Sequence, residues 1–104
     1  MKNASVLALA AAATLMASTA HANLQLAQKN ACMACHAVDK KLIGPAYQDV
    51  AKKYAGQKDA AAAVAASIKA GGAGKWGPVP MPPQPALSEA DIQTLAAWIL
   101  GGAK

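Results

Sequence analysis

Apolar residues recur at helical spacing along most of the chain, and no segment alternates in the way that a strand requires. The clearest helix begins near Ser88 and Asp91, whose spacing resembles a capping box. Its apolar stripe consists of Ile92, Leu95, Ala96 and Ile99, and Gly101-Gly102 end it. The pattern therefore predicts a chain that closes on an amphipathic helix.

Two shorter helices are expected in the first half of the chain. The second of them spans Ala46 to Tyr54, after Gly44-Pro45 breaks the chain, and ends at Gly56. The first runs into Cys32 and has one face made of Leu24, Ala27, Gln28 and Ala31.

A third helix is expected from Ala60 to about Ala70, with Asp59 as its N-cap and Gly71-Gly72 as its stop. The segment from Gly71 to Leu87 holds every proline except Pro45, so we expect a loop there. The prediction is thus an all-α fold of about four helices. Because the chain has 104 residues, it suffices for one domain and not for two.

The first 22 residues resemble a cleavable export signal. Lys2 gives a positive start, residues 6–16 form an apolar run, and Ala20-x-Ala22 has the small-x-small form of a signal-peptidase site. The alternative is a retained membrane anchor, but the run is shorter than the ~20 residues that a spanning helix needs. We therefore expect cleavage after Ala22, which leaves an exported domain of residues 23–104 with no stable membrane insertion.

The mature segment is short of large apolar side chains. It has 104 − 22 = 82 residues, no Phe, and many alanines, which bury little area each. Its aromatic residues are Tyr47, Tyr54, Trp76 and Trp98. Domains of this size often need a metal, a disulfide or a cofactor. A large, flat, apolar group such as a haem would complete the core.

Every basic side chain in the sequence is a lysine. Removal of Lys2 leaves nine of the ten lysines against five acids, a formal charge of 9 − 5 = +4. A nucleic-acid binder usually carries arginines with aromatics beside them. These lysines are scattered and the domain is expected to be exported, so no nucleic-acid partner is expected. Both solubility and steering toward an acidic partner explain such lysines, and composition leaves the two open.

The segment from Cys32 to His36 is a C-x-x-C-H motif. In a helical turn, positions i, i+3 and i+4 share a face, so the thiols of Cys32 and Cys35 can reach the two vinyl groups along one haem edge. The His36 imidazole on the same face is then held beneath the iron. This is the attachment pattern of c-type haem, and it predicts one haem c bound through two thioethers.

Three alternative roles for this motif are weaker. A thioredoxin-like redox site expects a strand before it and a βαβ context, which the pattern lacks. A disulfide between Cys32 and Cys35 would close too short a loop to stabilise much. A zinc site lacks ligands, because His36 is the only histidine left once His21 is removed.

A haem iron held by a histidine has a sixth position, and the mature chain offers two methionines for it. Met33 lies between the two cysteines and cannot reach the opposite haem face. Met81 lies in a segment whose prolines fix φ and stiffen the loop. Its thioether is a soft, neutral ligand that favours ferrous iron and raises the reduction potential. Proline-rich stretches also serve as linkers or polyproline ligands, but beside this motif we expect Met81 to bind the iron.

Pro45 has two interpretations. A ligating histidine usually donates its other N–H to a carbonyl or carboxylate, and a carbonyl in the stiff loop after the motif is well placed to accept it. Pro45 also stands just ahead of the second helix, where proline commonly starts helices. The residues themselves leave both interpretations open.

These residues, in this order, closely resemble the small bacterial monohaem class I cytochromes c of the five-fifty-one type, over essentially the whole mature chain. The landmarks are Cys32–His36, Ile43-Gly44-Pro45-Ala46-Tyr47, Trp76-Gly77-Pro78, Pro80-Met81-Pro82-Pro83 and Leu95-Ala96-Ala97-Trp98. The C-x-x-C-H motif occurs in many cytochromes, and the proline-rich loop around Met81 narrows the match.

The resemblance implies a class I cytochrome c fold, with four helices around one low-spin haem and with His36 and Met81 as axial ligands. It also implies that the Pro45 carbonyl accepts from the His36 ring and that the Trp76 indole N–H bonds a haem propionate. The family shuttles electrons in the periplasm of Gram-negative bacteria, often toward nitrite reductases, terminal oxidases or peroxidases. The chain departs from the family at Ala31, where glycine is common.

The sequence therefore predicts a periplasmic one-electron carrier and not an enzyme. A haem peroxidase or gas binder would need an open iron site and a distal acid or base, typically a second histidine. A thiol oxidoreductase would need Cys32 and Cys35 free. We expect a monomer that meets its redox partners transiently, steered by lysines near the haem edge such as Lys29 and Lys75.

Overall fold

The computed structural model describes residues 22–104, so the expected leader lies outside the described residues except for its last position. The described elements are a helix over residues 22–29, called here the N-terminal helix, then η1 (Cys32–Ala34), α2 (Tyr47–Tyr54), α3 (Ala60–Ala70) and α4 (Glu89–Leu100). Across this range the remaining chain is loop, apart from one isolated β-bridge between Gly72 and Met81. The predicted all-α fold with four α-helices is confirmed.

The helices of residues 22–104 are all too short or too polar to cross a membrane.

The start of α4 matches the sequence prediction. Ser88 takes the N-cap position, and its hydroxyl accepts a hydrogen bond of 3.1 Å from the Asp91 amide. This bond satisfies one of the free amide donors of the first helical turn. Glu89 and Asp91 add negative charge at the positive end of the helix dipole. The buried face then consists of Ile92, Leu95, Ala96, Trp98 and Ile99.

α3 owes its helical conformation mainly to alanine, the residue with the highest helix propensity. Asp59 occupies the N-cap position, as expected, although its side chain makes no capping hydrogen bond. Gly71 ends the helix with φ of 68°, and a Cβ there would collide with the Met81 carbonyl oxygen. A glycine is therefore required where α3 meets the loop that carries Met81.

The N-terminal helix does not run into Cys32 as expected. It ends at residue 29, and Ala31 then adopts a left-handed conformation with φ of 61° and ψ of 16°. η1 begins at the next residue, Cys32. A left-handed backbone costs an alanine roughly 1–2 kcal/mol, a cost that glycine avoids. Glycine would therefore fit the turn at position 31 better than alanine does.

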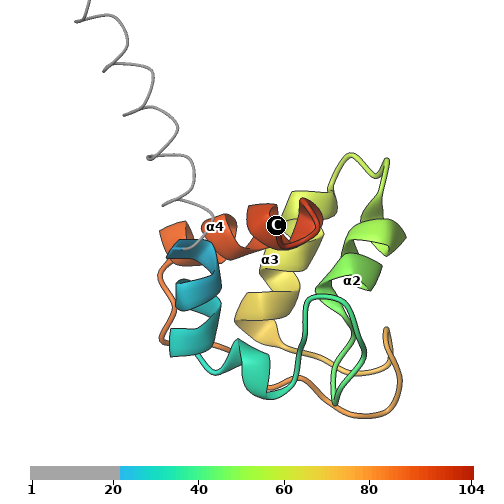
Figure 1. The fold of residues 1–104 in the computed structure, drawn as a ribbon, viewed down its shortest axis with the longest axis horizontal. Coiled ribbons are helices and arrows are strands. Elements are labelled where there is room, and N and C mark those ends of the chain that lie inside the picture. Colours follow the sequence, from blue (N-terminus) through green and yellow to red (C-terminus); the bar gives the residue numbers. More distant parts are fainter. Residues whose placement is uncertain (1–21) are drawn as a thin grey trace, which may run out of the picture.

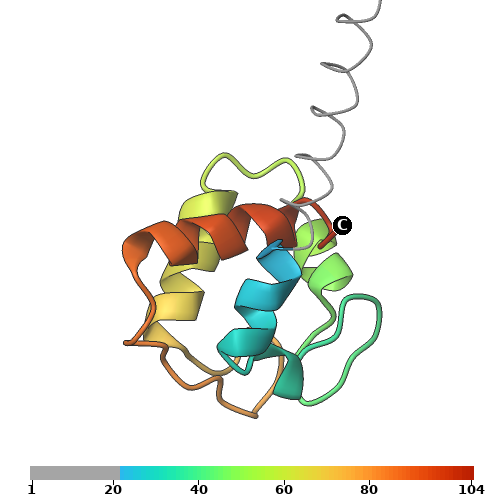
Figure 2. The same cartoon turned by 60° about the vertical axis from the view of Figure 1, so that its left-hand side comes forward.

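In Figure 1, α4 lies horizontally in the upper half of the molecule, and the connection between α2 and α3 rises above it. α4 contacts both α2 and α3, and Figure 2 shows it passing over the N-terminal helix. Ile92 and Leu95 of α4 are fully buried, as is Ala27 of the N-terminal helix. The hydrophobic core therefore sits directly under α4.

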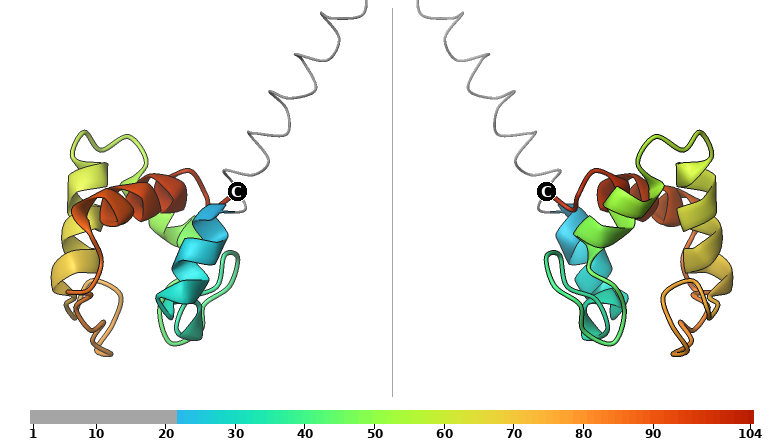
Figure 3. Two further views of the ribbon diagram at one scale, coloured as in Figure 1. Left: turned by 90° about the vertical axis from the view of Figure 1, so that its left-hand side faces the viewer. Right: turned by 90° about the vertical axis from the view of Figure 1, so that its right-hand side faces the viewer.

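Below α4 the segments divide into two groups, which Figure 3 shows from both sides. One group contains α3 and the loop of residues 71–87. The other contains the N-terminal helix, η1 and the loop of residues 36–46, which leads into α2. This division matters for function because a pocket lined by residues of both groups lies under α4.

Candidate functional site

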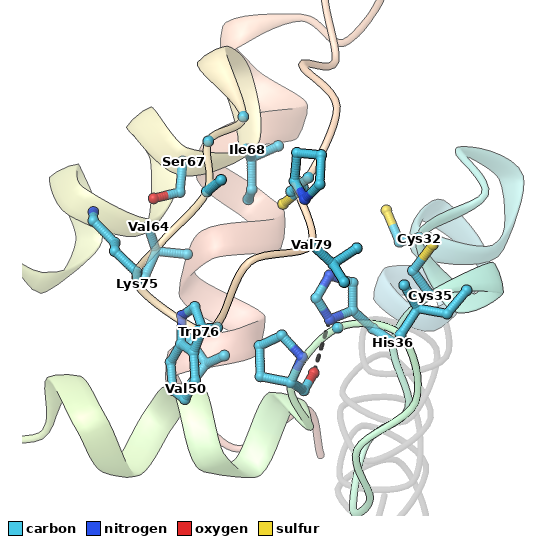
Figure 4. A pocket seen from close by; sticks show the side chains of 18 of the residues that line it. Cys32, Cys35, His36, Val50, Val64, Ser67, Ile68, Lys75, Trp76 and Val79 are labelled. Atoms are coloured by element: carbon cyan, nitrogen blue, oxygen red, sulfur yellow. Dashed lines mark hydrogen bonds between the residues drawn. The ribbon is translucent and has the colours of Figure 1, made fainter.

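The pocket brings together all six residues that the sequence singled out. It is lined by Cys32, Cys35, His36, Pro45, Trp76 and Met81, which come from segments far apart in the chain. Figure 4 shows Cys32, Cys35 and His36 on one side of the pocket, with Val64, Ser67 and Ile68 of α3 on the other. Leu95 and Ile99 of α4 also line it.

The His36 ring is oriented by a backbone carbonyl. Its Nδ1 lies 2.8 Å from the carbonyl oxygen of Pro45 (Figure 4). Because a carbonyl can only accept, Nδ1 carries the proton and Nε2 keeps its lone pair for a ligand. α2 begins at Tyr47 with Ala46 as its N-cap, so Pro45 lies outside the first helical turn. Of the two interpretations of Pro45, its contact with His36 is therefore the one that the geometry supports.

Gly44 packs against the imidazole so closely that no side chain fits. A Cβ at this position would lie 2.6 Å from Cε1 of His36 and 2.9 Å from its Nδ1. The Gly44 amide also donates to the Cys35 carbonyl at 2.8 Å, which ties the loop back to the motif. The sequence pattern indicated Gly44 only as a break before a helix and did not predict its contact with His36.

Tyr47 is a second residue that the sequence reasoning missed. Its ring stacks on His36 with centroids 5.0 Å apart and planes at 22°, and it meets Trp98 edge-on at 5.6 Å. Tyr47 is buried. Its position two residues after Pro45, within one of the landmarks of the resemblance, is the signal that could have drawn attention to it.

Burial shifts the pKa of two titratable groups beside His36, Tyr47 and Cys32. Burial raises the pKa of the Tyr47 hydroxyl well above its usual range, and the nearby Cys32 raises it further. Burial also raises the pKa of the Cys32 thiol, although a hydrogen bond from Tyr47 opposes this shift. Cys32 and Cys35 form no disulfide with each other and are both half-buried. A thiol oxidoreductase needs a cysteine of lowered pKa, so the raised pKa of Cys32 argues against that alternative.

Met81 is held by backbone pairing at the end of α3. Its amide donates to the Gly72 carbonyl at 2.8 Å, and the Gly72 amide donates to the Met81 carbonyl at 3.0 Å. The sequence predicted stiffness from the flanking prolines. The structure adds this bridge, which fixes the backbone of Met81 to the residue just after Gly71.

The residues of the pocket fit a covalently bound haem. One side offers two thiols and an imidazole whose Nε2 is free to bind, while Met81 offers a thioether from the other group of segments. Apolar side chains of α2, α3 and α4 line the space between them, as a macrocycle requires; they include Val50, Tyr54, Val64, Ile68, Leu95 and Ile99.

Comparison with known proteins decides the family. Residues 24–103 match the family model described as "Cytochrome c". The chain belongs to the cytochrome c family. It is 50% identical over 100 residues to cytochrome c-552 of Nitrosomonas europaea, which covers 96% of this chain and 97% of that protein. It is also 50% identical over 102 residues to cytochrome c-551 of Pseudomonas aeruginosa, again covering 96% and 97%.

Solved structures agree with this assignment. The crystal structure of wild-type Nitrosomonas europaea cytochrome c552 matches with a TM-score of 0.73 and 51% identity, covering 75% of this chain and 96% of that one. The class 1 cytochrome MtoD of Sideroxydans lithotrophicus matches with a TM-score of 0.70 at 33% identity, covering 81% and 96%. The chain is thus a class I cytochrome c of the c-551/c-552 type. It is an electron carrier and not an enzyme, and it carries one covalent haem c.

Proposed function

We propose that this cytochrome c carries single electrons between respiratory partners in the periplasm, with its haem attached through Cys32 and Cys35 and its iron bound by His36 and Met81. The observation that carries this proposal is that these four side chains line one pocket, although Met81 lies far along the chain from the other three. Expected partners are a nitrite reductase, a terminal oxidase or a peroxidase.

When bound, the haem supplies a one-electron couple at its iron. The protein supplies the ligands and their orientation. Cys32 and Cys35 anchor the cofactor through their Sγ atoms, and His36 presents Nε2 because its Nδ1–H is donated to Pro45. The contacts of Gly44 and Tyr47 with the ring leave the imidazole little freedom to turn.

On the other side, the Met81 thioether is a neutral ligand that stabilises the ferrous state and so raises the reduction potential. Its backbone is fixed by the bridge to Gly72, which favours a retained ligand. Trp76 lines the same pocket, and its indole N–H is the donor that we assign to a haem propionate. The apolar walls would keep water away from a bound haem iron, which would let its ligands control the potential.

Partner proteins are expected to dock transiently at the mouth of this pocket. Ile43 and Val79 line the pocket and are 60% and 59% exposed, so they offer apolar contact. Lys75 also lines the pocket, whereas Lys29 lies on the N-terminal helix outside its lining. A small apolar contact surrounded by basic residues lets the two proteins associate fast and dissociate quickly, as an electron carrier needs.

The periplasmic location follows from the leader that we propose is removed after Ala22. Intact mass spectrometry of the protein purified from the periplasm tests cleavage and attachment together. We expect one species with the mass of residues 23–104 plus one haem. The control is a variant with both Cys32 and Cys35 replaced by Ala, which should lose covalent haem. A retained leader, or a periplasmic species with the mass of the bare chain, would contradict the proposal.

A further inference from the structure

Lys53, near the end of α2, reaches the loop that carries Met81. Its Nζ lies 4.7 Å from the centroid of the Trp76 ring. The same Nζ donates to the carbonyl oxygen of Lys75 at 3.5 Å. Trp76 and Lys75 both line the haem pocket, and both precede Met81 in the loop of residues 71–87.

This contact joins the loop that carries Met81 to the histidine side of the pocket. α2 follows directly on the loop that orients His36, so Lys53 belongs to the histidine side. The other bonds of the Met81 loop stay on its own side: Met81 pairs with Gly72, and the Gln84 amide donates to Lys69 of α3. Within residues 22–104, the bond from Lys53 is the one hydrogen bond that links residues 22–59 to residues 71–83.

We propose that Lys53 is a positioning residue that holds Trp76 and its loop against α2, and thereby slows the release of Met81 from the iron. The inference deepens the proposed function and rests on ligation by Met81. An ammonium over an indole face is attracted by the ring quadrupole, and tryptophan is the strongest of the aromatic acceptors. Release of Met81 requires its loop to move away from the histidine side, and such a movement breaks the contact between Lys53 and Trp76.

Lys52 is a matched control because it is the preceding residue of α2, carries the same charge and is also exposed. Its side chain makes no hydrogen bond or ion pair in the part of the chain that the structure describes. Replacement of either lysine by methionine keeps most of the aliphatic stem and removes one positive charge. A difference between Lys53→Met and Lys52→Met therefore reports the contact and not the net charge.

The experiment is stopped-flow binding of imidazole to the ferric holoprotein, since imidazole can bind only after Met81 leaves. At high imidazole the observed rate reaches a plateau that equals the rate of loop opening. We expect Lys53→Met to raise this plateau roughly two- to fivefold, the factor that an exposed cation–π contact represents. Lys53→Arg, which keeps a cation over the ring, should restore the wild-type plateau, and Lys52→Met should leave it unchanged.

A double-mutant cycle with Trp76→Leu tests whether Lys53 acts through the indole. We expect Lys53→Met to have little further effect on the plateau once Trp76 is replaced. The proposal is overturned if Lys53→Met leaves the wild-type plateau unchanged, if Lys52→Met raises it equally, or if the effect persists in full without Trp76. Failure of the proposed ligation looks different: the wild type would then bind imidazole with a rate that rises linearly and shows no plateau.

Discussion

The imidazole of His36 stacks on the ring of Tyr47, with centroids 5.0 Å apart and planes at 22° to each other. Tyr47 covers one face of the imidazole, and the Pro45 carbonyl accepts a hydrogen bond from its edge, at 2.8 Å from Nδ1. The ring is thus oriented by a buried aromatic residue at the start of α2 and by the backbone of the loop just before it. A histidine held in this way would lose little entropy on binding an iron.

Replacement of Tyr47 by Leu should destabilise the holoprotein by about 2 kcal/mol, because two aromatic contacts worth ~0.5–1.5 kcal/mol each are lost with the ring. Tyr47→Phe is the control, since it keeps both ring contacts, and it should cost well under half as much. Denaturant unfolding measures both. Equal losses for Phe and Leu would mean that the hydroxyl, and not the stacking, makes the contribution.

Gly44→Ala should displace the His36 ring, since the new Cβ would lie 2.6 Å from Cε1. Forcing atoms into a packed site typically costs ~1–3 kcal/mol, and we expect a loss of stability in that range with a lower yield of holoprotein. Gly101→Ala is the matched control, because its Cβ would meet backbone oxygens only at 3.4 Å and 3.5 Å. If both variants behave alike, the close approach to His36 has no consequence.

Ala31→Gly should stabilise the protein by about 0.5–1 kcal/mol, which is the left-handed strain relieved less the extra freedom of glycine in the unfolded chain. The structural reason is the φ of 61° at Ala31. Ala34→Gly, within η1, should instead destabilise the protein by a similar amount. Thermal or denaturant unfolding distinguishes the two, and a destabilised Ala31→Gly would show that the turn is not strained.

Met81→Ala should leave the haem attached, open the sixth position and lower the reduction potential by a sizeable part of the ~0.8 V range that haem ligation spans. Potentiometry and the loss of the Met-to-ferric-iron charge-transfer band measure these changes. Met33→Ala is the control, because Met33 lies between the cysteines and packs against the core. An unchanged potential and band in Met81→Ala would identify Met81 as the wrong ligand.

Lys75→Glu should slow electron transfer to an acidic partner at low salt, because Lys75 lines the pocket at which we propose that the partner docks. Lys29→Glu should have a smaller effect, and Lys104→Glu, at the C-terminus outside the pocket lining, the smallest. The differences should fade as salt shortens the Debye length toward ~8 Å near physiological strength. If the stopped-flow rates depend neither on salt concentration nor on these charge-reversing substitutions, apolar contact governs docking.

Much of this protein was determined by local patterns in the sequence. The C-x-x-C-H spacing specifies haem attachment by itself, because the three reactive side chains lie within one turn of chain. The helix start at Ser88 and the helix stop at Gly71 were also predicted correctly, since capping depends on the few residues around each end.

The tertiary structure alone decided which distant groups meet. The stacking of Tyr47 on His36, the approach of Gly44 to the imidazole and the contact of Lys53 with Trp76 each join residues that share no periodicity in sequence. The left-handed turn at Ala31 was missed for a related reason. Alanine favours helix locally, and burial of the N-terminal helix at Ala27 outweighs the roughly 1–2 kcal/mol that a left-handed alanine costs.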